Sequence, residues 1–534
     1  MREEKRTIYA GARFITLDES RPEVECLCVM GGRIECLGSR EEVLASIGSA
    51  AHELVDLGGA VVYPGFIDTH SHLSLFSNMV NWALCGTACG SIAGVLEALR
   101  AWAGKNPEGW ILGYGYDDTG LPDARHLTRE DLDSVSTHRP VMVAHTSLHM
   151  GSFNSRALEL LGFDGKADIP SGEVVLDASG IPTGLLLENA FFQAIESLPQ
   201  PSPEQVMEHM RQAMHCYASK GFTTFIDGGV GAAGGPREFM QAYMELMRRG
   251  QMAIRGCLQL LPAEMDKVLE VGMRDLGSDW LRFGGVKLFI DGSIQGFTAA
   301  LGEGYHTRPD EFGCMLCTPE ELTEQVMRYH AKNIQVAIHT NGDRAAEVVV
   351  RAFEKAVERY PGHRPPHMVV HAQTVTDGHL RRMKACGVIP TFFARHVEVW
   401  GDRHKNLFLG PERAARIDPC GSAVALGMPF SLHVDTPVLP PSALESMSAA
   451  VNRVTSGGEV LGPEQRISAH EAVLAYTRYA ALCCGGEGRL GRLSPGGFAD
   501  FVVLDRCIEE SDPMSIRDIK VCATYCGGRR VYEA

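Results

Sequence analysis

The first feature that could do chemistry is a pair of histidines in the segment PGFIDTHSHL, residues 64–73. If His70 and His72 continue an extended strand, their spacing points both imidazoles to the same side, with Asp68 in line below them. Two neutral imidazoles that converge from one rigid strand end make half of a zinc site. A His-x-His pair also arises by chance in a chain with 20 histidines, so its meaning depends on its companions.

Three further residues of metal-binding type follow apolar runs elsewhere in the chain. His339 ends the run QVAIH, His371 ends HMVVH, and Asp435 follows PFSLHV. If these runs are parallel strands, all three side chains lie at their carboxyl ends, where barrel active sites gather. A lone histidine after such a run is more often a hydrogen-bonded core residue. Four histidines and an aspartate at the same end of successive strands are harder to assign to chance, so they predict a metal centre.

Lys287, in the segment GGVKLFIDGS, is a charged residue inside an otherwise apolar strand. Burial and nearby cations lower the pKa of a lysine and expose a neutral amine. A neutral amine can take up carbon dioxide to form a carbamate, an anionic oxygen ligand able to bridge two metal ions. The alternative is a lysine that reaches towards solvent or pairs with Asp291 or Asp343.

The elements that must position these residues are eight β-rich runs that alternate with amphipathic stretches. The runs are residues 61–70, 222–229, 253–260, 282–292, 335–343, 367–373, 388–396 and 429–437. Eight parallel strands close a barrel. Between the runs lie helical patterns such as residues 343–360, where apolar residues recur at helical spacing. The fold class predicted is α/β, with a (β/α)8 TIM-type barrel over residues 61–484.

Other segments fall outside the barrel pattern. Residues 1–60 and 485–534 read as short strands with turns, each too small to bury a core, so we expect one small β-sandwich built from both termini. The stretch 73–215, between the first two barrel strands, is too long for a structureless loop. It predicts an inserted α+β subdomain that covers the barrel mouth.

Taken together, these motifs resemble the amidohydrolase superfamily, and within it the YtcJ-like, amidohydrolase-3 group that contains N-substituted formamide deformylases. The matching pieces are PGFIDTHSH, VKLFIDGS, HTNGDRA, VHAQ, HVDTPV and the closing RLGRLSPGGFADFVVLD. The likeness runs through nearly the whole chain. It implies a metal-bearing barrel with a sandwich from both termini and an inserted subdomain after the first strand.

The resemblance also implies a ligand set. The implied ligands are His70 and His72 for the more buried metal with Asp435 beside them, carbamylated Lys287 as the bridge, and His339 and His371 for the second metal. The implied cofactors are zinc or another divalent metal, two per chain, with carbon dioxide as the carbamate. The chain departs from the group at HVDTPV, where GSDAPV is common, and so carries an extra imidazole, His433, near the mouth.

We expect the activity to be hydrolysis of a non-peptide C–N bond in an amide, formamide or cyclic amide. A metal-activated hydroxide would attack the carbonyl, and Asp435 would act as general acid/base between the water and the departing nitrogen. The expected substrate-binding residues are Tyr114, Tyr116, Asp117, His149, Arg395 and His396, since aromatic and polar groups near a barrel mouth set specificity. Core packing of the tyrosines and a surface ion pair for Arg395 are the alternatives.

Two other functions remain open at the level of the sequence. A mononuclear amino-heterocycle deaminase shares most of these ligands but relies on a glutamate near the sixth-strand histidine, where this chain has Gln373. Such an enzyme would also leave Lys287 without a task. A catalytically silent barrel that serves as an assembly scaffold is the third reading, but such proteins lose ligands that this chain retains.

The amino-acid composition indicates which classes of partner and which cellular compartment to expect. Acidic residues outnumber basic ones, 66 against 50, and the formal net charge of -16 argues against nucleic acid or an anionic membrane as the main partner. We therefore expect a small-molecule substrate; a homo-oligomer stays open. The N-terminus is charged and the chain has no long apolar run, so we expect neither a secretion signal nor a membrane span. Sixteen cysteines without framework spacing fit a reducing cytoplasm.

Overall fold

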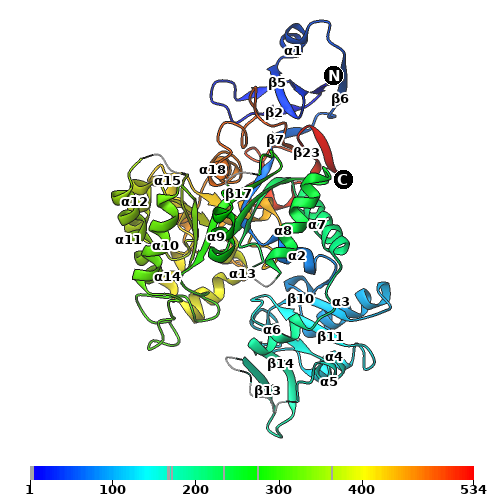
Figure 1. The fold of residues 1–534 in the computed structure, drawn as a ribbon, viewed down its shortest axis with the longest axis vertical. Coiled ribbons are helices and arrows are strands. Elements are labelled where there is room, and N and C mark those ends of the chain that lie inside the picture. The colour runs from blue at the N-terminus through cyan, green and yellow to red at the C-terminus, as the bar shows by residue number, and fades with distance from the viewer. Residues whose placement is uncertain (1–4, 165–168, 170–171, 232–234, 274–275, 363–364) are drawn as a thin grey trace. The chain divides into compact units, whose positions relative to one another are not determined.

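The computed structural model describes residues 5–164, 169, 172–231, 235–273, 276–362 and 365–534 (Figure 1). The chain divides into two compact units, and each has its own sheets and core. The first unit consists of Met1–Ser74, Ala213–Asp435 and Pro441–Ala534. The second consists of Leu75–Gln212 and Thr436–Pro440.

The first unit contains an eight-stranded parallel sheet whose strands follow chain order. They are β8 (Phe66–Ser71), β15 (Phe222–Gly228), β16 (Arg255–Leu260), β17 (Leu281–Phe289), β18 (Val336–Thr340), β19 (Met368–His371), β20 (Ile389–Phe392) and β21 (Ser431–Leu432). The first and last strands approach each other, because the hydroxyl oxygens of Thr69 and Ser431 are 2.8 Å apart. The sheet is thus a nearly closed barrel of TIM type, and each predicted run contributes one strand to it.

The predicted run 61–70 is wrong as a single strand. Its first part is β7 (Val61–Pro64), which belongs to a different sheet, and only β8 enters the barrel. The chain passes between the two sheets at Gly65, where an added Cβ would lie 2.2 Å from Oγ1 of Thr223. A residue without a side chain is therefore required at this crossing.

Helices separate the barrel strands along the chain. They include α8 (Pro236–Arg248), α9 (Pro262–Glu270), α10 (Pro319–Ala331), α11 (Asp343–Arg359), α12 (Asp377–Cys386) and α13 (Arg395–Arg403). The helical pattern predicted over 343–360 is α11, and its apolar residues Val349, Val350 and Phe353 are buried. Figure 1 shows α10, α11 and α12 side by side, on one flank of the barrel strands.

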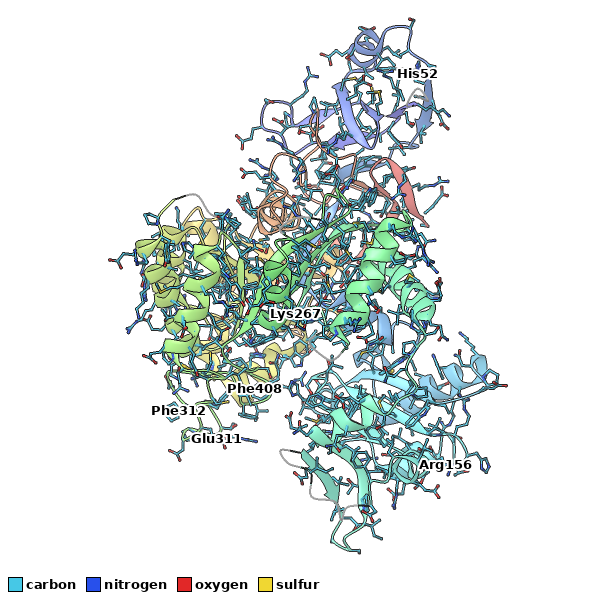
Figure 2. The ribbon with its side chains drawn as sticks, viewed as in Figure 1. His52, Arg156, Lys267, Glu311, Phe312 and Phe408 are labelled. Carbon is cyan, nitrogen blue, oxygen red and sulfur yellow. The ribbon has the colours of Figure 1, made fainter. Side chains whose placement is uncertain are left out.

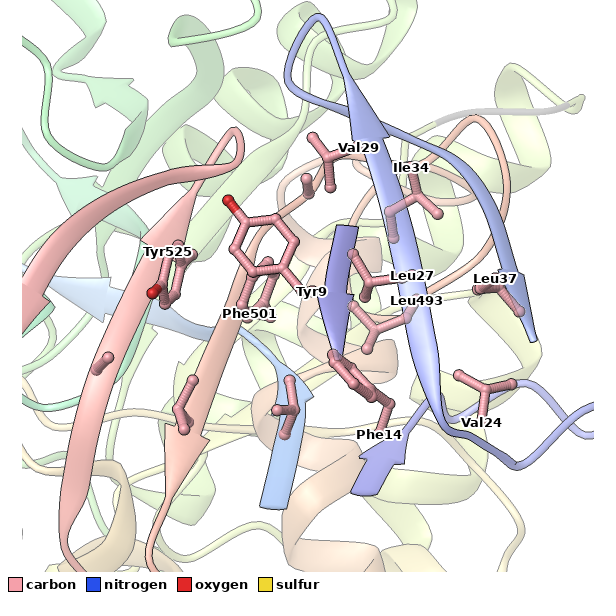
Figure 3. Close-up of a cluster of buried hydrophobic side chains, with 14 residues drawn as sticks. Tyr9, Phe14, Val24, Leu27, Val29, Ile34, Leu37, Leu493, Phe501 and Tyr525 are labelled. Carbon is pink, nitrogen blue, oxygen red and sulfur yellow. The ribbon is translucent and has the colours of Figure 1, made fainter. Parts of the chain in front are cut away.

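Strands from both ends of the chain share one sheet. Its order is β24 (Arg529–Glu533), β23 (Val521–Cys526), β22 (Phe501–Leu504), β7, β2 (Arg13–Ile15) and β3 (Glu23–Val24). A second sheet has the order β5 (Arg33–Gly38), β4 (Cys26–Met30), β1 (Arg6–Ala10) and β6 (His52–Asp56). The ring of Tyr9 lies 5.0 Å from that of Phe501 and 5.2 Å from that of Tyr525, so both termini bury one apolar cluster (Figure 3).

The second unit has a six-stranded sheet of its own. The order is β13 (Gly172–Leu176), β14 (Pro182–Glu188), β12 (Met150–Phe153), β11 (Val141–His145), β10 (Ile111–Tyr116) and β9 (Ala83–Leu84). Helices α3 (Ile92–Lys105), α5 (Ser155–Leu161) and α6 (Asn189–Glu196) belong to the same unit. A cover over the barrel mouth remains a prediction.

Charged residues of both signs are exposed at the surface. Arg156, Lys267 and Glu311 are exposed, whereas Phe408 is buried; all four are labelled in Figure 2. All sixteen cysteines are free thiols. Among the described residues, none of the helices combines the length and the apolar character that crossing a membrane requires.

Candidate metal centre

The barrel strands deliver the predicted ligands to one end of the sheet. His70 lies in β8 with His72 just after it, Lys287 in β17, His339 in β18 and His371 at the end of β19, while Asp435 follows β21. These positions are at or near the carboxyl ends of parallel strands. The barrel therefore brings together side chains that are far apart in the sequence, as the strand-end pattern predicts.

His70, His72 and Asp435 form a three-donor group. The Nε2 atoms of His70 and His72 lie 3.3 Å and 3.4 Å from Oδ1 of Asp435. Donors that bind one tetrahedral zinc ion at roughly 2.0–2.1 Å are about 3.3 Å from one another. Among the described residues, that carboxylate oxygen has no hydrogen-bond partner. The spacing and the orphaned buried oxygen both fit a divalent cation.

Two pairs of imidazoles each have the spacing expected of two ligands on one ion. The ring centres of His70 and His72 are 5.0 Å apart, and those of His339 and His371 are 4.6 Å apart. Two imidazoles on one tetrahedral ion have ring centres about 5 Å apart, given a nitrogen–zinc distance of roughly 2.0 Å. His70 and His371 are 5.4 Å apart, ring centre to ring centre, so the two pairs are adjacent.

Lys287 is fully buried beside these ligands. Its Nζ lies 3.1 Å from Nε2 of His70. Burial lowers the pKa of Lys287 to about 7, although the charge of Asp435 acts in the opposite direction. The carboxylate of Asp291, an alternative partner, instead accepts the backbone N–H groups of Asn341 and Gly342. Lys287 is thus placed with the ligands, and its amine is mostly neutral only above about pH 7.

The protonation states of the buried ligands favour metal binding. Burial, together with nearby Lys287, holds the pKa of His70 well below its ordinary value, and burial with His339 does the same for His371. Burial opposes ionisation of Asp435, but contacts with His70 and His72 hold its pKa well below the ordinary value. Neutral imidazoles beside an ionised carboxylate are the protonation states that divalent cations bind.

The backbone at the site is strained and tightly packed. His371 and Asp435 have φ values of 66° and 55°, in the left-handed region that residues with side chains rarely adopt. Such strain is concentrated at functional sites. Gly228, in β15, faces the ring of His70, and an added Cβ there would lie 2.2 Å from Nδ1. The sequence reasoning missed Gly228, because the contact depends on the pairing of β15 with β8.

Two of the predicted substrate residues lie in α13, in the same unit as the metal centre. The ring of His396 is 6.4 Å from that of His371, and its Nδ1 is 3.5 Å from Oδ1 of the buried Asp418. Arg395 contacts two carboxylates, with Nε 3.0 Å from Glu398 and a terminal nitrogen 2.6 Å from Glu445. A role for either in binding substrate stays a prediction.

The remaining predicted substrate residues belong to the inserted unit. Tyr116 is fully buried in its apolar core, and its hydroxyl lies 3.2 Å from Oγ of Ser152; Tyr114 is buried as well. His149 is exposed, with Nδ1 3.0 Å from the carboxylate of Glu188. Asp117 accepts the backbone N–H and the hydroxyl of Thr119. Their contacts with substrate also stay predictions.

A second cluster of metal-ligand residue types, Asp117, Asp118 and His145, lies in the inserted unit, where the parallel strands β10 and β11 end. Nε2 of His145 is 3.1 Å from Oδ1 of Asp118 and 3.9 Å from Oδ1 of Asp117. Nδ1 of His145 accepts the backbone N–H of Ser147, so that Nε2 is the nitrogen that faces the carboxylates. This group is therefore an imidazole facing two carboxylates. The residues directly after two apolar runs were the signal that could have found it.

Comparisons with known proteins agree with this picture. A family model described as "Amidohydrolase family" matches residues 53–532. The chain is 28% identical over 537 residues to "Putative amidohydrolase YtcJ" of Bacillus subtilis (strain 168), with 99% of both chains covered. It is 28% identical to "N-substituted formamide deformylase" of Arthrobacter pascens, covering 97% of this chain and 96% of the relative. A solved structure of an uncharacterized metal-dependent hydrolase from Pyrococcus furiosus is 26% identical, with a TM-score of 0.75 over 95% of this chain and 100% of that chain.

Proposed function

Since the chain belongs to the amidohydrolase family, we propose that it is a metal-dependent hydrolase of a non-peptide C–N bond in an amide, formamide or cyclic amide. The observation that carries this proposal is the convergence of His70, His72 and Asp435 beside the buried Lys287. The likeness to a formamide deformylase supports the C–N bond as the one cleaved. The substrate is a small molecule, and the protein acts in the cytoplasm.

The residues would hold two divalent ions, of zinc or another metal. His70 and His72 would hold the more buried ion with Asp435 beside them, and His339 and His371 would hold the second. Lys287 would supply the bridging ligand as a carbamate, its neutral amine forming a bond to the carbon of carbon dioxide and releasing one proton. When bound, such ions lower the pKa of a water towards about 7 and polarise the substrate carbonyl.

Asp435 is the proposed general acid/base. Its pKa lies well below the ordinary value despite burial, so the carboxylate is ionised and can accept the proton of the attacking water. It then returns that proton to the departing nitrogen, because the amine leaves only when protonated. Its Oδ1 has no hydrogen-bond partner among the described residues and is therefore available for this transfer.

Substrate contacts come from two places in this proposal. Arg395 and His396, in α13, lie at the same end of the barrel as the metal ligands. The inserted unit would supply Tyr114, Tyr116, Asp117 and His149. Arg395 binds a substrate carboxylate, since guanidinium geometry suits carboxylates. The substrate then competes with Glu398 and Glu445 for the guanidinium group.

The test is a turnover screen of metal-reconstituted protein against N-formyl amines, N-acyl amines, cyclic amides and amino-heterocycles, with amine and ammonia measured separately. Release of amine from an amide, lost in chelated protein and in Asp435→Asn, supports the proposal. Ammonia release from an amino-heterocycle at one metal per chain would instead identify a mononuclear deaminase. Wild-type protein that takes up no metal would refute both.

A further inference from the structure

His433 is an imidazole beside the metal site, and the ligand set above leaves it without a role. It follows β21 directly and lies two residues before Asp435, in the same unit. Its side chain is fully buried. Among the described residues, neither ring nitrogen of His433 has a hydrogen-bond partner.

The distances between ring centres match those between ligands. Its centre lies 5.3 Å from the ring of His70 and 5.1 Å from the ring of His371. The two rings of the His-x-His pair, His70 and His72, are separated by a similar 5.0 Å. Imidazoles that share a tetrahedral ion have centres about 5 Å apart. His433 therefore stands at ligand spacing from one imidazole of each pair.

The unpartnered nitrogens require an explanation. A buried polar atom without a partner costs roughly 1–3 kcal/mol, so such atoms in folded proteins usually meet a group that satisfies them. His404, also fully buried, shows the usual solution: its Nδ1 lies 2.8 Å from the carbonyl of Trp400 and its Nε2 2.7 Å from the side chain of Gln373. His433 differs because the rings of His70, His371 and Phe393 lie 5.1–5.3 Å from its own, centre to centre, and neither of its nitrogens has a hydrogen-bond partner among the described residues.

We propose that His433 is an additional imidazole ligand of this metal centre. The inference rests on the proposed function, since it needs the divalent ions that the other ligands hold. One ring nitrogen donates its lone pair to an ion, and the proton stays on the other nitrogen. The ligand shell of this chain then contains five imidazoles, from His70, His72, His339, His371 and His433.

The test combines solution affinity with a structure of the zinc-loaded protein. Zinc affinity is measured by competition with a chromophoric chelator for wild type, His433→Leu and His433→Gln. Leucine fills a similar volume without orphaned nitrogens, so the metal-free variant should be at least as stable as wild type. We expect zinc affinity to fall at least tenfold in both variants. In the crystal, a His433 nitrogen should lie about 2.0–2.1 Å from an ion.

The matched control is His404→Gln, which removes a buried imidazole with partners. It should lower the thermal midpoint while leaving zinc affinity unchanged. Unchanged affinity in both His433 variants, or a His433 ring more than about 3 Å from every ion, would overturn the inference while the proposed function stands. Wild-type protein without bound zinc would instead overturn the proposed function, so the two failures are distinguishable.

Discussion

Lys287→Met gives the sharpest prediction, because methionine fills a similar volume but cannot carry a proton or a carbamate. In the metal-free protein, burial lowers the pKa of Lys287 from 10.5 to about 7. At about 1.36 kcal/mol per pH unit, this difference corresponds to roughly 5 kcal/mol. That is the cost of burying the ammonium group at any pH below about 7.

The pH dependence follows from the direction of this shift. Between about pH 7 and 10.5 the folded chain holds a neutral amine while the unfolded chain still binds the proton, so stability rises with pH. Lys287→Met has no such titration. The metal-free variant should therefore be more stable than wild type at pH 7, and the difference should shrink towards pH 10. For a chain of 534 residues, roughly 5 kcal/mol shifts the unfolding midpoint by roughly 5 °C.

The assay is thermal unfolding of chelated and of zinc-reconstituted protein, with bicarbonate present, at several pH values. Reconstitution should reverse the order, because only wild type has the bridging group. Lys267→Met is the control: Lys267 is exposed and pairs with Glu264, so its loss should change stability by at most about 0.5 kcal/mol at every pH. Metal-free Lys287→Met that is less stable than wild type at pH 7 would refute the buried-amine reasoning.

Three further predictions concern a buried ion pair, the packing against His70 and substrate recognition. Arg255→Met should lower the free energy of unfolding, measured in denaturant, by roughly 3–5 kcal/mol, because it leaves the buried Asp500 without its bidentate partner. Replacing both residues by apolar ones should restore most of that stability. Gly228→Ala should lower zinc affinity at least tenfold, because the added Cβ displaces His70. Gly104→Ala, where an added Cβ meets nothing within 4 Å, should leave zinc affinity unchanged. Equal zinc affinities of the two variants would contradict the role of Gly228 in packing against His70. Arg395→Ala should raise KM for anionic substrates selectively, and an equal change for neutral substrates would count against carboxylate recognition.

The sequence was informative about the metal centre because its signals are local. A histidine or aspartate after an apolar run identifies a strand end without knowledge of its neighbours. Lys287 was noticeable because a charged residue inside an apolar strand has few stable arrangements. The barrel follows from the number and apolar character of the runs, and the structure confirms it.

What the sequence could not supply depends on pairing between distant segments. The packing of Gly228 against His70 follows from the register of β15 and β8. The division of residues 61–70 between two sheets depends on close contact at Gly65. These are long-range contacts, and no local residue pattern encodes them.

The most direct test of the central claim is the number of zinc ions per chain, measured by elemental mass spectrometry after reconstitution with zinc and bicarbonate. We predict two ions per chain in wild type and one or fewer in Lys287→Met, because the bridge holds the second ion in place. One ion per chain in both proteins would contradict the binuclear centre, and no bound zinc in wild type would contradict the metal-dependent hydrolase itself.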